Sequence, residues 1–177
     1  MRIVVSGTHA SGKSTLIADF AAAHPEYRVL PDPFEFLDEE ADADAAAFVA
    51  QLRLSAARLS RLTPGDAVIA ERGPLDFLAY LDALDALGRP GGTRELLRAA
   101  APATERAMAH VDLLVVLPVT PADDIRVPAD EDPALRTAMD DALREFADDP
   151  DLTGGARVLE IAGTPERRLR LLEDALG

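Results

Sequence analysis

Residues 2–14 of the chain read RIVVSGTHASGKS, and this stretch decides the fold. Residues 2–6 form a short apolar run typical of a buried parallel strand, and residues 14–24 have the pattern of the helix that follows it. Between them, Gly7 and Gly12 allow backbone angles that bulkier residues cannot adopt. A loop of this kind turns its N–H groups onto a polyphosphate, and the helix N-terminus adds its dipole. We therefore expect a nucleotide phosphate site here.

The polar residues of this loop are of the types that bind ATP and Mg2+. Lys13 is expected to bridge the β- and γ-phosphates, the Ser14 hydroxyl to ligate Mg2+, and Thr15 to donate to the α-phosphate. Lys13 is the only lysine among 18 basic residues, and its compact ammonium reaches between phosphates better than a planar guanidinium does. His9 has no partner at metal-ligand spacing, and its backbone is expected to serve the phosphates. The predicted nucleotide-binding residues of the loop are Gly7, His9, Ala10, Ser11, Gly12, Lys13, Ser14 and Thr15.

The composition excludes several classes of protein. A chain of 177 residues with 48% hydrophobic content and a mean hydropathy of +0.01 suits one globular domain, 1–177. A net charge of −14 opposes nucleic-acid binding, which needs clustered basic residues. No apolar run reaches the roughly 18 residues that a transmembrane helix requires. The chain has no cysteine and no signal-peptide pattern, so we expect a cytoplasmic protein without disulfides.

Short apolar runs alternate with helical patterns along the rest of the chain. This alternation predicts a parallel sheet with helices on both faces and ligands beyond the carboxyl ends of its strands. Thr93 is expected to cap one helix, and Pro102 to kink or divide it. Strands are expected at 2–6, 27–30, 67–70, 111–117 and 158–162, and helices at 14–24, 43–62, 75–87, 93–110, 133–147 and 165–176.

Acidic and basic residues follow two of the predicted strands. Glu71 and Arg72 come directly after the third strand, where the carboxylate can hold Mg2+ and the guanidinium can reach a phosphate. Asp32 follows the second strand between two prolines, which fix its backbone. A rigid carboxylate beside the phosphate loop can accept a proton from a substrate hydroxyl. Asp32 and Glu35 both remain candidates for this base, and either pattern also suits an ordinary turn or surface pair.

The stretch Arg72-Gly73-Pro74-Leu75-Asp76-Phe77-Leu78-Ala79-Tyr80, together with the phosphate loop, resembles the nucleoside-kinase-like P-loop proteins. These include relatives of ribosylnicotinamide kinase and deoxynucleoside kinases, and small AAA-type ATP-binding proteins. The resemblance implies a three-layer α/β/α sandwich with strand order 2-3-1-4-5, a helical lid, and ATP-dependent transfer to a hydroxyl. It also implies that Asp32 is the base and that Glu71 and Arg72 form the acidic-arginine pair. Gly73 stands where these kinases often carry serine, so substrate contacts there are not carried over.

Residues 120–153 are expected to contain the lid. In related kinases, arginines at this position close over the transferring phosphoryl group, which favours Arg126 and Arg136 as catalytic residues. Arg136 with Asp140, and Asp140 with Arg144, are also spaced as local pairs on one helix face, and we expect this role for Arg144. Thr164 and Pro165 lie where related kinases bind adenine, and they also suit a helix N-cap. A guanine-selective Asn-Lys-x-Asp motif is excluded because the only lysine lies in the phosphate loop.

The resulting hypothesis is an ATP-dependent kinase that phosphorylates a hydroxyl of a nucleoside or a similar small molecule. The catalytic set is Lys13, Asp32, Arg72, Arg126 and Arg136, with Ser14 and Glu71 as metal ligands. A nucleotide-dependent regulatory ATPase or switch is the alternative from another class, and an antibiotic- or natural-product phosphotransferase is a third. The apolar helix at 75–87 suits either a core or a homodimer interface, so the sequence does not decide the oligomeric state.

Overall fold

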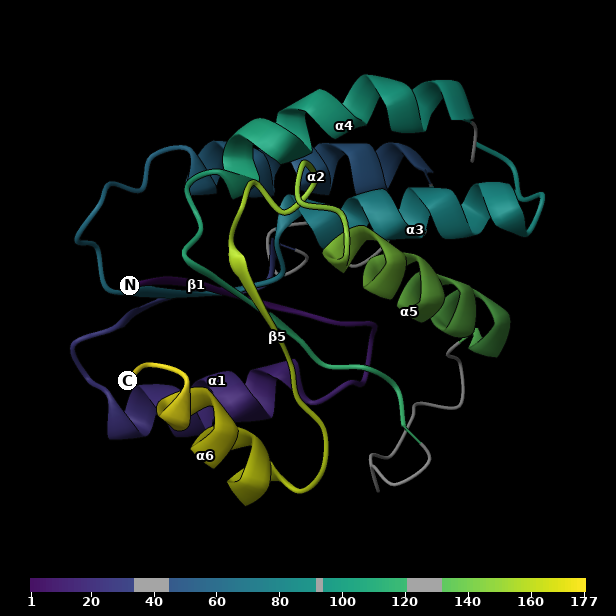
Figure 1. Ribbon diagram of the computed structural model, residues 1–177. Coiled ribbons are helices and arrows are strands. Elements are labelled where there is room, and N and C mark those ends of the chain that lie inside the picture. Colours follow the sequence, from purple (N-terminus) through teal and green to yellow (C-terminus); the bar gives the residue numbers. More distant parts are fainter. Residues whose placement is uncertain (34–44, 92–93, 121–131) are drawn as a thin grey trace.

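The computed structural model describes residues 1–33, 45–91, 94–120 and 132–177 (Figure 1). Its centre is a five-stranded parallel sheet with the order β2-β3-β1-β4-β5, as the resemblance implied. Residues Ile3 and Val5 of β1 face one side of the sheet and Val4 faces the other, because side chains alternate along a strand. The strands are β1 (Arg2–Ser6), β2 (Arg28–Leu30), β3 (Val68–Glu71), β4 (Leu113–Val116) and β5 (Arg157–Glu160).

Helices cover both faces of this sheet. Figure 1 shows α1 and α6 on one face and the remaining helices on the other, which completes the predicted three-layer sandwich. The helices are α1 (Lys13–Ala23), α2 (Ala45–Leu59), α3 (Pro74–Ala86), α4 (Arg94–Met108), α5 (Pro133–Ala147) and α6 (Pro165–Asp174). In the described parts of the chain, no helix is long and apolar enough to cross a membrane.

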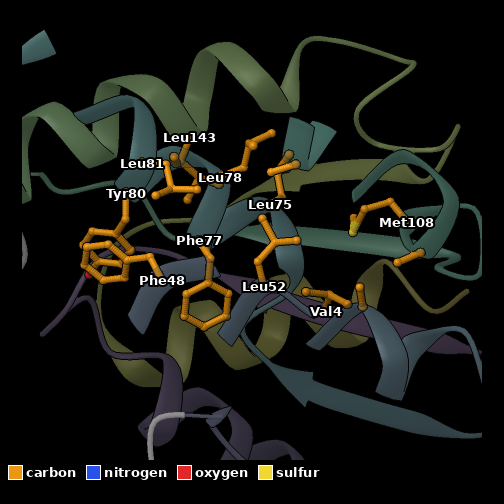
Figure 2. Close-up of a cluster of buried hydrophobic side chains, with 14 of the residues drawn as sticks. Val4, Phe48, Leu52, Leu75, Phe77, Leu78, Tyr80, Leu81, Met108 and Leu143 are labelled. Atoms are coloured by element: carbon orange, nitrogen blue, oxygen red, sulfur yellow. The ribbon is translucent and has the colours of Figure 1, made fainter. Parts of the chain in front are cut away.

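The larger hydrophobic core lies between the sheet and helices α2 to α5 (Figure 2). Phe77 is completely buried there, and Phe48 stacks on Tyr80 with ring centroids 4.6 Å apart. Phe48, Phe77 and Tyr80 therefore belong to this core. Phe34 and Phe36 lie outside the described residues.

The expected division of one helix at Pro102 is wrong. Helix α4 runs from Arg94 to Met108 as a single helix and contains Pro102. Pro102 is exposed, whereas Ala107 and Met108 on the packed side are completely buried. The hydrogen bond that proline removes is therefore lost on the solvent side, and core packing holds the helix together. The expected N-cap, Thr93, lies outside the described residues.

Phe77→Ala should strongly destabilise the fold, because it removes a completely buried ring from the core between α3 and the sheet. We expect a loss of about 3–5 kcal/mol in the free energy of unfolding, measured by urea denaturation. Val158→Ala is the control, because Val158 on the edge strand β5 is 38% exposed, and its expected effect is about 0.5 kcal/mol or less. Equal losses in the two variants would contradict this description of the core.

Candidate active site

The loop between β1 and α1 has the close backbone packing that its glycines predict. A Cβ atom added at Gly7 would lie 2.6 Å from Ser11 Oγ and 3.0 Å from the carbonyl oxygen of Leu117. Gly12, the N-cap of α1, has a φ of 89° in the left-handed region, where glycine alone is unstrained. Because this N-cap has no side chain, the N-terminus of α1 is open to an anion. The loop and the open N-terminus of α1 therefore form a site that suits a polyphosphate.

Lys13 lies inside this loop and is only 4% exposed. Its Nζ donates a hydrogen bond to the carbonyl oxygen of Thr8 at 2.7 Å. Burial lowers the pKa of Lys13 to about 7, and the neighbouring Arg72 lowers it further against the opposing pull of nearby carboxylates. A bound polyphosphate would supply the negative charge that this ammonium group needs.

Asp76 is a completely buried carboxylate that sequence analysis did not identify as a site residue. Its Oδ1 accepts the N–H of Gly7 at 2.9 Å, while its Oδ2 accepts the Ser6 hydroxyl at 2.6 Å and the N–H of Gly73 at 2.8 Å. Burial raises the pKa of this carboxyl, and Arg72 and the hydrogen-bond donors oppose the rise. Asp76 therefore joins the start of the phosphate loop to the start of α3. The sequence signal was a carboxylate within the otherwise apolar run from Leu75 to Tyr80.

Arg72 connects the loop to the other candidate residues. Its Nε donates to Asp32 Oδ2 at 2.7 Å, and its Nη1 donates to the carbonyl oxygen of Gly7 at 3.0 Å. The guanidinium also lies 3.8 Å from Asp76 and 5.6 Å from the centre of the Tyr80 ring. Burial alone would lower the pKa of Arg72, but Tyr80, Asp32 and Asp76 outweigh it and raise the pKa.

The backbone of Arg72 is strained, since its φ is 61°. Left-handed angles are uncommon for residues other than glycine, and they concentrate at functional sites. The turn occurs directly after β3, where the Arg72 N–H still bonds to the carbonyl oxygen of Val5 at 3.0 Å. The chain thus leaves the sheet abruptly and keeps the buried guanidinium at the carboxyl edge.

The two predicted metal ligands lie together. The Ser14 hydroxyl donates to Glu71 Oε1 at 2.8 Å, and Ser14 is exposed while Glu71 is 9% exposed. This pair of oxygen ligands suits Mg2+, which retains waters and uses few protein ligands beside phosphate. The described residues contain no group of three or more His, Cys, Asp or Glu side chains that could hold a metal ion.

The structure brings Asp32 to the site through its ion pair with Arg72, whereas the competing base Glu35 lies outside the described residues. The Asp32 side chain is 15% exposed, so it remains accessible from one side. Arg58 of α2 donates to the carbonyl oxygen of Pro31 at 2.8 Å and fixes the chain just before Asp32. The lid residue Arg126 also lies outside the described residues.

Arg136 of α5 lies on the phosphate loop. Its Nε donates to the carbonyl oxygen of His9 at 3.1 Å, and its Nη2 donates to that of Ala10 at 3.2 Å. The N–H of His9, which was expected to serve the phosphates, instead donates to the Tyr80 hydroxyl at 3.2 Å. Tyr80 fills this position because its ring is fixed by stacking on Phe48.

Arg144 interacts with its expected partner Asp140 and with a second carboxylate. Burial raises the pKa of Asp140, and the positive charge of Arg144 opposes this rise, while the Asp140 side chain also accepts the N–H of Val119 at 3.0 Å. Arg144 Nε lies 3.4 Å from Glu160 Oε2 of strand β5. The side chains of Arg144 and Glu160 are 53% and 51% exposed, so this ion pair lies on the surface.

The start of α6 approaches the loop from the other side of the sheet. Thr164 caps this helix and Pro165 is its first residue, as predicted. Arg168, 3% exposed, donates from Nη1 to the carbonyl oxygen of Ser11 at 2.6 Å. Sequence analysis missed this contact. The available signal was a basic residue four positions before Leu172, on the side of α6 that is buried.

Asp76→Asn should destabilise the fold, because the amide NH2 group cannot accept the hydrogen bonds that the carboxylate oxygens receive from Gly7, Gly73 and Ser6. We expect a loss of about 3 kcal/mol in the free energy of unfolding, measured by urea denaturation. Asp85→Asn on the same helix is the control, since the ion-pair contact of Asp85 within the described residues is a long one, 3.8 Å from the exposed Arg94. A stability of Asp76→Asn equal to that of the control would refute the structural role of Asp76.

Nucleotide binding should be coupled to proton uptake by Lys13. Its pKa of about 7 in the free protein rises when phosphate binds, so at pH 8 the complex holds more protons than the separate components. Affinity should then fall by up to about tenfold per pH unit above pH 7. Calorimetric titration of Mg-ATP at pH 8, in two buffers with different ionisation enthalpies, measures the uptake. Proton release, or no proton exchange, would contradict the account of Lys13.

Comparisons with known proteins show the family to which this chain belongs. A family model described as an AAA domain matches residues 2–168, and no curated protein matches the chain. A solved thymidylate kinase from Candida albicans covers 98% of this chain and 89% of its own, at 16% identity and a TM-score of 0.67.

Two structures of deoxyadenosine kinase from M. mycoides are also similar. The one with bound dATP covers 99% of each chain at 13% identity and a TM-score of 0.71. The one with dCMP and dCDP covers 99% of this chain and 98% of its own, at 14% identity and a TM-score of 0.70. At these identities the likeness shows the shared fold. The chain therefore belongs to the AAA domain family and has the fold of nucleoside- and nucleotide-kinase-like P-loop proteins.

Proposed function

We propose that the protein is a kinase that transfers the γ-phosphoryl group of ATP to a hydroxyl of a nucleoside or a similar small molecule. One observation carries the proposal: Arg72 binds both Asp32 and the carbonyl oxygen of Gly7, at 2.7 Å and 3.0 Å. One buried guanidinium thereby contacts both a candidate base and the phosphate loop. This arrangement suits a reaction in which a hydroxyl beside Asp32 meets a phosphate in the loop.

The residues have separate roles in this reaction. The loop and Lys13 bind the β- and γ-phosphates, and Thr164 and Pro165 lie beside adenine. Asp32 accepts the proton of the acceptor hydroxyl, whose oxygen bonds to the γ-phosphorus as the bond to the β,γ-bridging oxygen breaks and ADP leaves. Arg72 stabilises the charge on the phosphoryl oxygens. Ser14 and Glu71 would hold Mg2+, which would supply further positive charge at the phosphates.

Gln51 of α2 supports an acceptor with a hydrogen-bonding ring. It is 1% exposed, yet neither its amide nitrogen nor its amide oxygen has a hydrogen-bond partner among the residues that the structure describes. Its neighbours one helical turn away contact the site: Phe48 stacks on Tyr80, and the Ser55 hydroxyl lies 3.5 Å from the Arg72 carbonyl oxygen. An unpaired buried amide is costly, and its donor and acceptor together match the edge of a nucleobase.

Asp32→Asn should abolish phosphoryl transfer and preserve nucleotide binding. With a panel of nucleosides and hydroxylated metabolites, we expect substrate-dependent ADP release to fall about 100- to 10,000-fold. A non-hydrolysable ATP analogue should still raise the melting temperature. Asp112→Asn is the matched control, since Asp112 also pairs with an arginine, Arg2 at 2.6 Å, but before β4 at the opposite end of the sheet.

Two results would contradict the proposal. Undiminished transfer by Asp32→Asn would remove Asp32 from the role of base. ATP hydrolysis by the wild-type protein that no small molecule stimulates would favour the regulatory ATPase instead. A panel response confined to antibiotics or other natural products would keep the kinase chemistry but change the acceptor class.

A further inference from the structure

The phosphate loop is held by its carbonyl groups. Each of five successive backbone carbonyls accepts a hydrogen bond from a positively charged side chain. Arg72 and Lys13 bind the first two and, like Arg136, belong to the catalytic set expected from the sequence. The last three are bound by arginines of α5 and α6, helices on opposite faces of the sheet (Figure 1). The bonds run from Arg72 to Gly7, from Lys13 to Thr8, from Arg136 to His9 and Ala10, and from Arg168 to Ser11.

Because the peptide bond is planar, the Arg168 contact also fixes the direction of a backbone N–H group that can bind an anion. In a trans peptide the C=O and the N–H point in opposite directions. Arg168 Nη1 holds the Ser11 carbonyl oxygen at 2.6 Å, so the N–H of Gly12 is fixed pointing away from α6. Arg136 imposes the same constraint on the two preceding peptides. Backbone N–H groups oriented before the ligand arrives bind phosphate without a further cost of ordering the loop.

We propose that Arg168 is a positioning residue that orients the Ser11–Gly12 peptide of the phosphate loop for nucleotide binding. The inference rests on the proposed nucleotide-dependent function and extends it to a residue on the face of the sheet opposite α5. Arg168 acts through the loop backbone, and Arg136 is its counterpart from the other helical layer.

The burial of Arg168 supports this role over a packing role. Arg168 is 3% exposed on the same side of α6 as Leu172, which is completely buried. Taking a guanidinium out of water is costly, and an aliphatic side chain would fill such a place at lower cost. The Arg168 guanidinium makes a short hydrogen bond to the carbonyl oxygen of Ser11, a residue 157 positions away in the sequence. This bond supports a role for the buried charge in orienting the loop.

The test compares Arg168→Met, Arg168→Lys and the control Arg170→Met, which changes an exposed arginine of the same helix. The readout is the dissociation constant of a non-hydrolysable ATP analogue with Mg2+, which needs no acceptor. We expect Arg168→Met to weaken binding about 10- to 100-fold, the range for a hydrogen bond to a charged group. Arg168→Lys should recover most of the affinity because one donor suffices for one carbonyl. Arg170→Met should bind like the wild type.

Hydrogen exchange of the 7–12 amides in the unliganded protein gives a second, independent readout. Arg168→Met should accelerate exchange in this loop while leaving the β4 amides unchanged, which also shows that the variant is folded. Wild-type affinity and wild-type loop exchange in Arg168→Met would overturn the inference. So would a folded Arg168→Lys variant as weak as Arg168→Met. If the wild-type protein failed to bind the analogue, the proposed function would fall, and loop exchange alone would decide the role of Arg168.

Discussion

The buried carboxylate of Asp76 is the interaction on which the rest of the site depends. It receives the N–H groups of Gly7 and Gly73 and the hydroxyl of Ser6, which fixes β1, the phosphate loop and α3 relative to one another. Removing a buried charge from such a network leaves its partners unsatisfied, so all of them must be present together. The positive φ of Arg72 is held in this setting, because the residues on both sides of the turn are anchored. A local carboxylate at the start of one helix thereby determines the geometry of the whole carboxyl edge.

Electrostatics explains how a chain with a net charge of −14 can bind an anion. The positive side chains Lys13, Arg72, Arg136 and Arg168 all donate to carbonyls of one loop. Their bonds concentrate positive charge at the N-terminus of α1, whose dipole favours an anion as well. Burial, with a further contribution from the positive charge of Arg72, lowers the pKa of Lys13 at this position. The net negative charge of the chain is thus combined with a local concentration of positive charge, which can attract a small anion to one place.

The sequence predicted the elements well because each has a local cause. Pro133 begins α5 and Thr164 caps α6 as expected, since capping and proline act within one turn. The predicted pairing of Ser14 with Glu71 also follows from strand ends meeting at one edge. Arg168 was missed because its partner Ser11 lies 157 residues away. Asp76 was missed because its bonds to Gly7 and Ser6 span 69 and 70 residues, although its bond to Gly73 is local. Only the tertiary fold shows what a charged residue within an apolar helix face contacts.

We propose that this network presents a phosphate loop already shaped for Mg-ATP. A crystal structure of the protein with Mg2+ and a non-hydrolysable ATP analogue tests it most directly. The account predicts the triphosphate within residues 7–14, a loop backbone displaced by less than about 1 Å, and intact bonds from Asp76 to Gly7 and Gly73. An analogue bound elsewhere, or a loop that must break those bonds to admit phosphate, would contradict it.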